Sequence, residues 1–445
     1  MTKIISNKSN VDLDYPICRP SLDLDFTQEE LDPRITFSRG SIGTRVNRNR
    51  LIETVAANQP RFDYDPVTGE CKGLLIEDSR INYELYSGDP TQWTLNTNMT
   101  LTGNSIVLPD GTTSTNVEYR GTDSGANVKI LRPGPSGAAV VAGETWTFSI
   151  FLRAGTEKTV HLVFQNQTGG DSVGCLFDLV TGQFPGSITG SNAANGSRGV
   201  QYVGNGWYRV WLTNTYQSSN ANQQTFVRLR TNSTSVQYTT SFSAWGAQLE
   251  RGTFPTSYIP TTASTVTRSA DLAEMTGTNF SSWYNSSEGS MVASFSTIYE
   301  GSQVSARTPG VWGLSQPTTQ YANSNGYGLT VRSDTRQFQF AHRFISTDLN
   351  INEALIPPTS SLTVQPYIKQ KVSCSYLPYL MRMSINGATV LQIKDRNYNS
   401  LSQTALLIGT QRIGGATIKE LTGHISRLTY YPRALNPNQL QTLTS

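Results

Sequence analysis

Large apolar and small polar residues alternate along several stretches of the chain, as in strands with one buried and one exposed face. Residues 145–152 place four large apolar side chains on one face of an extended chain, and residues 337–344 place three phenylalanines and a histidine on one face. Turn-forming pairs such as Asp110-Gly111 and Asn386-Gly387 separate these stretches. Alternation with period two, interrupted by such turns, is typical of antiparallel sandwiches and jelly rolls. The sequence therefore predicts an all-β protein.

The strand-like stretches fall into two groups, and the residues before the first group show little periodicity. We predict an extended N-terminal attachment arm over residues 1–86 and a jelly-roll domain over residues 87–260. A second antiparallel β-sandwich is predicted over residues 289–445. Residues 261–288, rich in Thr and Ser, follow two prolines that would interrupt a β-ladder, so we expect a linker there.

The end of the chain carries the one clear helix signal. Asn436 is a favourable N-cap, Pro437 suits the first helical position, and Leu435 is spaced to pack against Leu440. We expect a short amphipathic helix to close the second sandwich.

Composition narrows the function classes. The formal net charge of +3 over 445 residues provides no overall field to attract nucleic acid or an anionic membrane. The four cysteines are widely spaced without a CxxC pair, so we expect free thiols, no metal site and no cofactor. The N-terminus lacks the apolar core of a signal peptide, and no apolar run approaches the roughly 20 residues of a membrane span. We therefore expect neither secretion nor membrane insertion.

The arm carries an acidic block followed by a basic block. Such blocks can pair within the segment or with a neighbouring subunit, and an arm that ties an assembly together would use the second option. A solvated surface loop is the alternative. The candidate docking residues are Arg34, Arg39, Arg45, Arg48, Arg50 and Arg61.

Motifs in the arm resemble a known family. Residues 31–41 read Leu-Asp-Pro-Arg-Ile-Thr-Phe-Ser-Arg-Gly-Ser, residues 60–66 read Pro-Arg-Phe-Asp-Tyr-Asp-Pro, and residues 73–77 read Gly-Leu-Leu-Ile-Glu. Together with Arg-Ile-Asn at 80–82, this order looks like the N-terminal region shared by many tailed-bacteriophage virion proteins. The resemblance implies a tail, fibre or minor structural protein, made in the host bacterial cytoplasm and located in the virion. It also implies partners among other phage virion proteins and a homo-oligomer, with a trimer favoured.

Both sandwiches carry further resemblances. Trp-Thr-Phe-Ser at 146–149, Gly-Trp-Tyr-Arg-Val at 206–210 and Trp-Gly-Ala-Gln-Leu-Glu at 245–250 resemble a carbohydrate-binding-like jelly roll that recurs in phage proteins. Gly-His-Ile-Ser-Arg-Leu at 423–428, running into Pro-Arg-Ala-Leu at 432–435, resembles a laminin-G-like, concanavalin-type sandwich. These families include sugar binders, protein binders and inert spacers, so the resemblance implies the folds and leaves glycan binding open.

One strand-like stretch is a candidate glycan platform. Trp207, Arg209 and Trp211 fall on one face of an extended chain, so two indoles would flank a guanidinium. Indoles stack on sugar rings, and arginine donates to hydroxyls or to an acidic sugar. The alternative is that these aromatic residues pack in a core or in an oligomer interface.

No catalytic motif is present, and the three histidines fall in separate strands. Together with this absence, the resemblance to phage virion proteins implies a tail fibre, spike or tail-associated adhesin that displays its sandwiches to a host-surface polysaccharide. A capsid decoration protein (cement protein or head fibre) is the first alternative. A polysaccharide depolymerase is the second, because two catalytic carboxylates need no local signature. Its unranked candidate acids are Asp178, Glu250 and Glu300.

Overall fold

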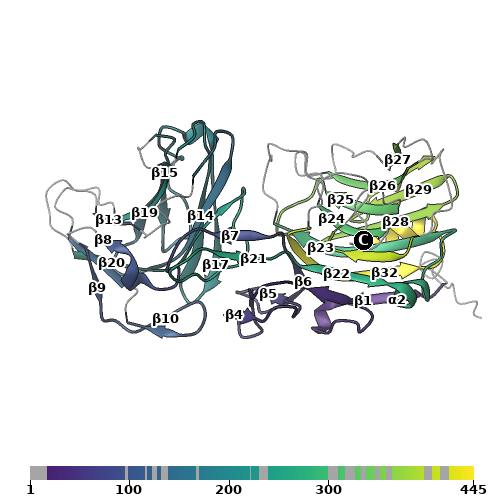
Figure 1. Ribbon diagram of the computed structural model, residues 1–445, viewed down its shortest axis with the longest axis horizontal. Coiled ribbons are helices and arrows are strands. Elements are labelled where there is room, and N and C mark those ends of the chain that lie inside the picture. Colours follow the sequence, from purple (N-terminus) through teal and green to yellow (C-terminus); the bar gives the residue numbers. More distant parts are fainter. Residues whose placement is uncertain are drawn as a thin grey trace, which may run out of the picture.

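Two antiparallel β-sandwiches lie side by side along the long axis of the molecule (Figure 1). This arrangement is seen in a computed structural model and confirms the all-β prediction. The structure describes residues 18–95, 99–115, 118–122, 128–131, 139–166, 170–220, 222–229, 239–298, 309–315, 326–331, 337–345, 351–356, 363–394, 403–410 and 420–445.

The first of these, here called the central sandwich, consists of a six-stranded and a five-stranded sheet. The six-stranded sheet has the order β17-β18-β14-β20-β12-β9, and the five-stranded sheet has the order β16-β15-β19-β13-β8. A short hairpin, β10-β11, lies beside them. The strands of the central sandwich and its hairpin are β8 (Thr94–Leu95), β9 (Met99–Thr102), β10 (Ile106–Val107), β11 (Thr113–Ser114), β12 (Glu118–Thr122), β13 (Val128–Leu131), β14 (Thr145–Ala154), β15 (Thr159–Asn166), β16 (Val173–Asp178), β17 (Gly196–Gly204), β18 (Trp207–Thr215), β19 (Gln223–Leu229) and β20 (Thr239–Arg251). Single 3-10 turns lie at Pro90–Gln92 and Ala193–Asn195.

The second, here called the terminal sandwich, has an eight-stranded sheet with the path β30-β29-β28-β23-β32-β6-β5, to which β1 adds by pairing with β32. Its seven-stranded sheet has the order β2-β22-β31-β24-β25-β26-β27. The later strands are β22 (Leu272–Thr276), β23 (Gly289–Thr297), β24 (Gly310–Ser315), β25 (Gly326–Val331), β26 (Phe338–Ile345), β27 (Ile351–Ile356), β28 (Gln370–Leu377), β29 (Leu380–Ile385), β30 (Leu391–Lys394), β31 (Ala405–Ile408) and β32 (Gly423–Tyr431). The helices are α2 (Gly277–Ser281) and α3 (Pro437–Thr444).

Four strands of the N-terminal segment, residues 18–82, belong to the terminal sandwich. Its strands are β1 (Leu22–Asp25), β2 (Thr36–Ser38), β3 (Gly43–Val46), β4 (Ile52–Val55), β5 (Phe62–Tyr64), β6 (Cys71–Ile76) and β7 (Arg80–Asn82), with a 3-10 turn at Phe26–Gln28. β6 pairs with β32, and β2 pairs with β22. Seven of its apolar residues lie in the core of that sandwich: Leu22, Leu24, Phe26, Ile35, Phe62, Leu74 and Ile76. Over its described residues, the predicted extended arm is therefore wrong.

The chain crosses between the sandwiches twice, and the two crossings pair with each other. β7 leads into the central sandwich, and β21 (Val266–Arg268) leads back, antiparallel to β7, with Asn82 opposite Val266. The predicted linker at 261–288 is thus a strand pair followed by β22 and α2. The central sandwich is therefore an insertion in the terminal sandwich. The apolar pattern did not predict this insertion, because the N-terminal strands of the terminal sandwich pair with strands more than 200 positions later in the chain.

Gly73, in the motif at residues 73–77, shows why the N-terminal segment can pack closely against β32. Gly73 has a φ of +100° at an irregularity of the β5–β6 ladder. A Cβ there would lie 2.3 Å from the carbonyl oxygen of Ile425 on β32. Only glycine lets these two backbones approach so closely at this φ.

Several local predictions are confirmed. Asn386 and Gly387 both have positive φ in the turn between β29 and β30. Asn436 caps α3 in a reciprocal capping box with Gln439, and Pro437 begins the helix. These features depend on residues close in sequence, so the pattern alone specified them.

The insertion predicts how the chain will respond to truncation. Residues 289–445 alone should fail to fold, because they lose seven buried apolar side chains whose burial is worth on the order of 10 kcal/mol together. Replacing residues 84–264 with a short Gly-Ser linker should leave a cooperatively folding terminal sandwich, because β7 and β21 already bring the ends together. Circular dichroism during thermal unfolding distinguishes the two shortened chains. A cooperative transition for residues 289–445 would refute this account.

Candidate binding site between the two sandwiches

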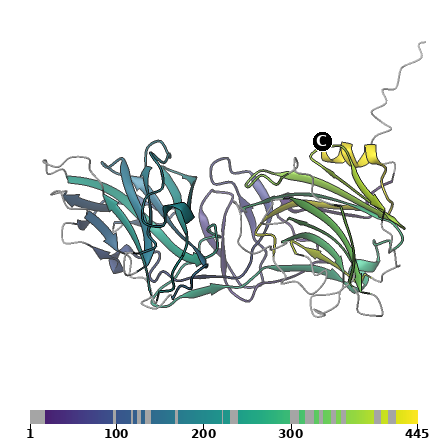
Figure 2. The ribbon, with the colours of Figure 1, turned by 90° about the horizontal axis from the view of Figure 1, so that it is seen from above.

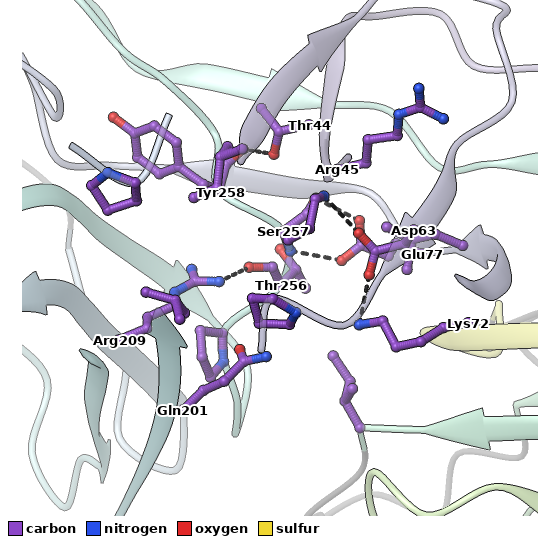
Figure 3. A pocket seen from close by; sticks show the side chains of 18 of the residues that line it. Thr44, Arg45, Asp63, Lys72, Glu77, Gln201, Arg209, Thr256, Ser257 and Tyr258 are labelled. Atoms are coloured by element: carbon purple, nitrogen blue, oxygen red, sulfur yellow. Dashed lines mark hydrogen bonds and ion pairs between the residues drawn. The ribbon is translucent and has the colours of Figure 1, made fainter. Parts of the chain in front are cut away.

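A cavity of about 130 Å³ lies where the N-terminal segment meets both sandwiches (Figure 3). The central sandwich contributes residues of β14, β17 and β18 and the loop at 255–258, and the terminal sandwich contributes Ile298, Tyr367 and His424. Figure 2 shows part of the N-terminal segment, in purple, between the two sandwiches. The cavity reaches solvent, because lining residues Arg50 and Tyr367 are exposed.

The predicted glycan platform lies at this junction but is covered. Trp207, Arg209 and Trp211 share one face of β18, as predicted, while Val210 and Leu212 enter the central core. The three side chains of that face are only 1%, 7% and 3% exposed. This face is therefore covered, as the alternative of packing anticipates, and glycan contact by these residues stays a prediction.

Trp207 has a packing role. It lies in a small apolar cluster with residues of β10, β14 and β20, and its indole nitrogen donates to the carbonyl of Val107 at 2.9 Å. Arg209 and Trp211 instead line the cavity. Residues beyond the sheet cover this face, which alternation within β18 could not indicate.

Arg209 is held by neutral groups. Its Nη1 donates to the carbonyl of Thr256 at 2.7 Å and its Nη2 to the hydroxyl of Ser149 at 3.1 Å. The guanidinium carbon lies 5.3 Å from the ring centre of Phe151. Within the described residues, Nε has no hydrogen-bond partner and no carboxylate is within ion-pair distance. Burial lowers the pKa of Arg209, opposed by the attraction of Glu250 and Glu77.

The carboxylates at the cavity are compensated. Glu77 accepts from the backbone N–H and the hydroxyl of Ser257 at 2.7 and 2.6 Å. Burial raises the pKa of Glu77, but Arg268 and Arg61 outweigh this and bring it to about 2. Asp63 accepts from the backbone of Val46 at 2.7 Å.

Behind the cavity lies a buried ionic cluster, here called the junction cluster: Arg39, Arg61, Glu77, Arg268 and Asp271. Arg39 pairs with Asp271 at 3.1 Å, Arg61 pairs with Asp271 and, at 2.8 Å, with Glu77. Arg268 pairs with Glu77 at 2.8 Å. All five side chains are at most 1% exposed. The cluster joins the N-terminal segment to the strand that returns from the central sandwich.

Two of the six predicted docking arginines therefore have an internal role. Arg39 and Arg61 are buried in the junction cluster and cannot reach another subunit in this fold. Three others pair within the N-terminal segment, Arg34 with Asp32, Arg45 with Glu53 and Arg48 with Glu29, and Arg50 donates to the carbonyl of Val67. For these four, docking stays a prediction.

A histidine joins the cavity wall to the N-terminal segment. His424 Nε2 lies 2.7 Å from Asp63 Oδ2, which also pairs with Lys72 Nζ at 2.7 Å, and His424 Nδ1 lies 3.4 Å from the Ser296 hydroxyl. Burial lowers the pKa of His424, and Lys72 adds to this, against the attraction of Asp63. Burial raises the pKa of Asp63, but Lys72 and His424 hold it well below its usual range. The lowered pKa favours the neutral form of His424.

The carboxylates described here do not match a glycosidase pair. A general acid needs a raised pKa, whereas those of Asp63 and Glu77 are lowered. Asp178 caps a turn by accepting hydrogen bonds from the backbone N–H groups of Val180 and Thr181. Glu250 is buried and accepts a hydrogen bond from the hydroxyl of Thr256. Glu300 lies outside the described residues. Among the residues described, no group of three His, Cys, Asp or Glu side chains could hold a metal, and no helix is long and apolar enough to cross a membrane.

No protein-family model and no curated protein matches the chain. Among solved structures, it is similar to a carbohydrate-binding module of a Ruminococcus gnavus sialidase bound to α2,3-sialyllactose, with 13% identity, a TM-score of 0.29 and coverage of 36% of this chain and 83% of that one. A leech intramolecular trans-sialidase gives 11% identity, a TM-score of 0.29 and coverage of 36% and 23%. Botulinum neurotoxin type C gives 11% identity, a TM-score of 0.28 and coverage of 39% of each chain. Scores this low carry no inference about ligand or activity.

Removing a carboxylate from the junction cluster should be costly. Asp271→Asn leaves Arg39 and Arg61 without their shared anion, so we expect a loss of about 3–5 kcal/mol in the free energy of unfolding, measured in urea. Asp32→Asn, which breaks the partly exposed pair with Arg34, is the control and should cost at most about 1 kcal/mol. Equal losses would contradict a structural role for the cluster.

His424 should make stability fall as the pH falls below neutrality. Its folded pKa lies below the unfolded value of 6.5, so between these values the unfolded chain binds a proton that the folded chain does not. We expect His424→Gln to flatten the loss of unfolding free energy between pH 7 and pH 5, by up to roughly 1.4 kcal/mol per pH unit in that window. Denaturant midpoints across this range test it, and parallel pH profiles for the two proteins would refute it.

Proposed function

We propose that this chain is a structural protein of a tailed-bacteriophage virion, a tail fibre, spike or tail-associated adhesin that presents its sandwiches to a host-surface glycan. The proposal extends to a homo-oligomer, with a trimer favoured, and to attachment through other virion proteins. Its starting point is the resemblance of the motifs between residues 31 and 82 to the N-terminal region of phage virion proteins.

The observation that carries the proposal is the position of the resembling motifs in the fold. Arg39, Arg61 and Glu77 belong to three of these motifs and form most of the junction cluster. Asn82 belongs to a fourth and bonds to the carbonyls of Ala247 and Ile259 in the central sandwich. The motifs thus hold two sandwiches in a fixed relation, which suits a protein that projects a recognition surface from a particle.

Recognition of a glycan is supported by the cavity at the same junction. It combines aromatic walls with polar side chains, the composition expected of a site for a small polar ligand. Attachment would use the exposed surface of the N-terminal segment, where Arg48 and Arg50 lie, since Arg39 and Arg61 are inside. A capsid decoration protein would use the same attachment chemistry and is the alternative.

Immunogold electron microscopy of purified particles tests the proposal. Antibodies raised against the full chain should label the tail or its fibres in particles made by the genome that encodes it. The matched control is particles in which the gene is interrupted, which should show no label. Gold on the head would replace the adhesin with the decoration protein, and a chain missing from purified particles would refute a virion role.

A further inference from the structure

The cavity between the sandwiches has an unequal set of charges. Its lining carries four cationic side chains, Arg45, Arg50, Lys72 and Arg209, and two carboxylates, Asp63 and Glu77. Both carboxylates are fully engaged inside the protein, Asp63 by Lys72 and His424 and Glu77 by the junction cluster.

Two of the four cations have no carboxylate partner. Arg45 pairs with Glu53 at 2.6 Å and Lys72 with Asp63 at 2.7 Å. Within the described residues, Arg50 and Arg209 make no ion pair. Arg50 is exposed at the rim, so water compensates its charge. Arg209 is only 7% exposed, so water hardly solvates its guanidinium. Because a buried charge without a counter-ion is unfavourable, the guanidinium favours an anion in the cavity.

The surroundings of Arg209 suit a sugar ring. Gln201 lies opposite Arg209 in the β17–β18 ladder and on the same face, and its carboxamide makes no hydrogen bond within the described residues. Figure 3 shows Gln201 and Arg209 on the same side of the pocket. Trp211 adds an indole, and Tyr367, 47% exposed, adds a phenol at the rim. An aromatic wall with a free amide and an unpaired guanidinium offers stacking, hydroxyl recognition and a carboxylate contact.

We propose that this cavity binds the terminal carboxylate-bearing sugar of a glycan, with the carboxylate on Arg209, a hydroxyl on Gln201 and the ring against Trp211. The inference rests on the glycan-recognition part of the proposed function and adds the ligand class. The cavity of about 130 Å³ is smaller than the roughly 300–1,000 Å³ of sites for drug-sized ligands, so it takes one sugar unit rather than a long oligosaccharide.

The test is titration calorimetry of the full chain with D-glucuronic acid as the probe. D-glucose, which lacks the carboxylate, and the neutral methyl ester of glucuronic acid are the matched ligands. We expect glucuronate to bind at least about tenfold more tightly than either, because a charge-assisted hydrogen bond to a buried guanidinium is lost with them. Equal binding of the three, or no binding of glucuronate, would overturn the proposal.

Variants locate the binding. Arg209→Gln should abolish the preference for glucuronate over its ester. Arg251→Gln, on β20 of the same sheet and paired with Glu144, is the control that should retain it. If Arg209→Gln shows no cooperative thermal transition, Gln201→Ala serves as the test variant, since the partly exposed Gln201 side chain makes no hydrogen bond within the described residues. Gln201→Ala should weaken the binding of glucuronate several-fold. Unchanged affinity in a folded Arg209→Gln or in Gln201→Ala would overturn the proposal.

The two proposals fail separately. A chain that labels the tail but binds no glucuronate keeps its virion role and loses this ligand. A chain that binds glucuronate through Arg209 but is missing from particles keeps the ligand and loses the virion role.

Discussion

The junction cluster is the constraint on which the rest of the structure depends. Five ionised side chains are removed from water there, and each is tolerable only while its partners are in place. Those partners come from the N-terminal segment and from the strand that returns from the central sandwich, and Ser257 of the central sandwich completes the shell of Glu77. The two sandwiches are therefore coupled through the hydrogen bonds of Ser257 to Glu77 as well as through the pairing of β7 with β21.

The same coupling creates the cavity. Trp207 is buried by residues of the central sandwich itself, whereas Arg209 and Trp211 line the space that the N-terminal segment and the terminal sandwich enclose. A guanidinium that would be solvated on an open sheet becomes a buried charge held by a carbonyl, a hydroxyl and a ring. The potential for recognition at this site thus arises from how two domains meet and not from either sheet alone.

Burial of the motif residues changes the meaning of the charge blocks near the N-terminus. Sequential acidic and basic blocks are compatible with docking to another subunit or with pairing inside the chain. The fold uses the second option for all the pairs described, from the exposed Arg48–Glu29 to the buried Arg61–Asp271. The difference between these two pairs is position in the fold, since both join an arginine to an acid.

The sequence by itself determined the features that depend on near neighbours. Alternation in β14, β18 and β26 specified strands and their two faces, Asn386-Gly387 specified a turn, and Asn436 specified the start of α3. Only the tertiary structure decided what lies against each face: that β6 and β1 join β32, that Asp271 meets Arg39 and Arg61, and that Arg209 faces a cavity. Strand periodicity repeats every two residues and distinguishes inside from outside within one strand. The pairings with β32 and the ion pairs of Asp271 join residues more than 200 positions apart, and local periodicity contains no information about them.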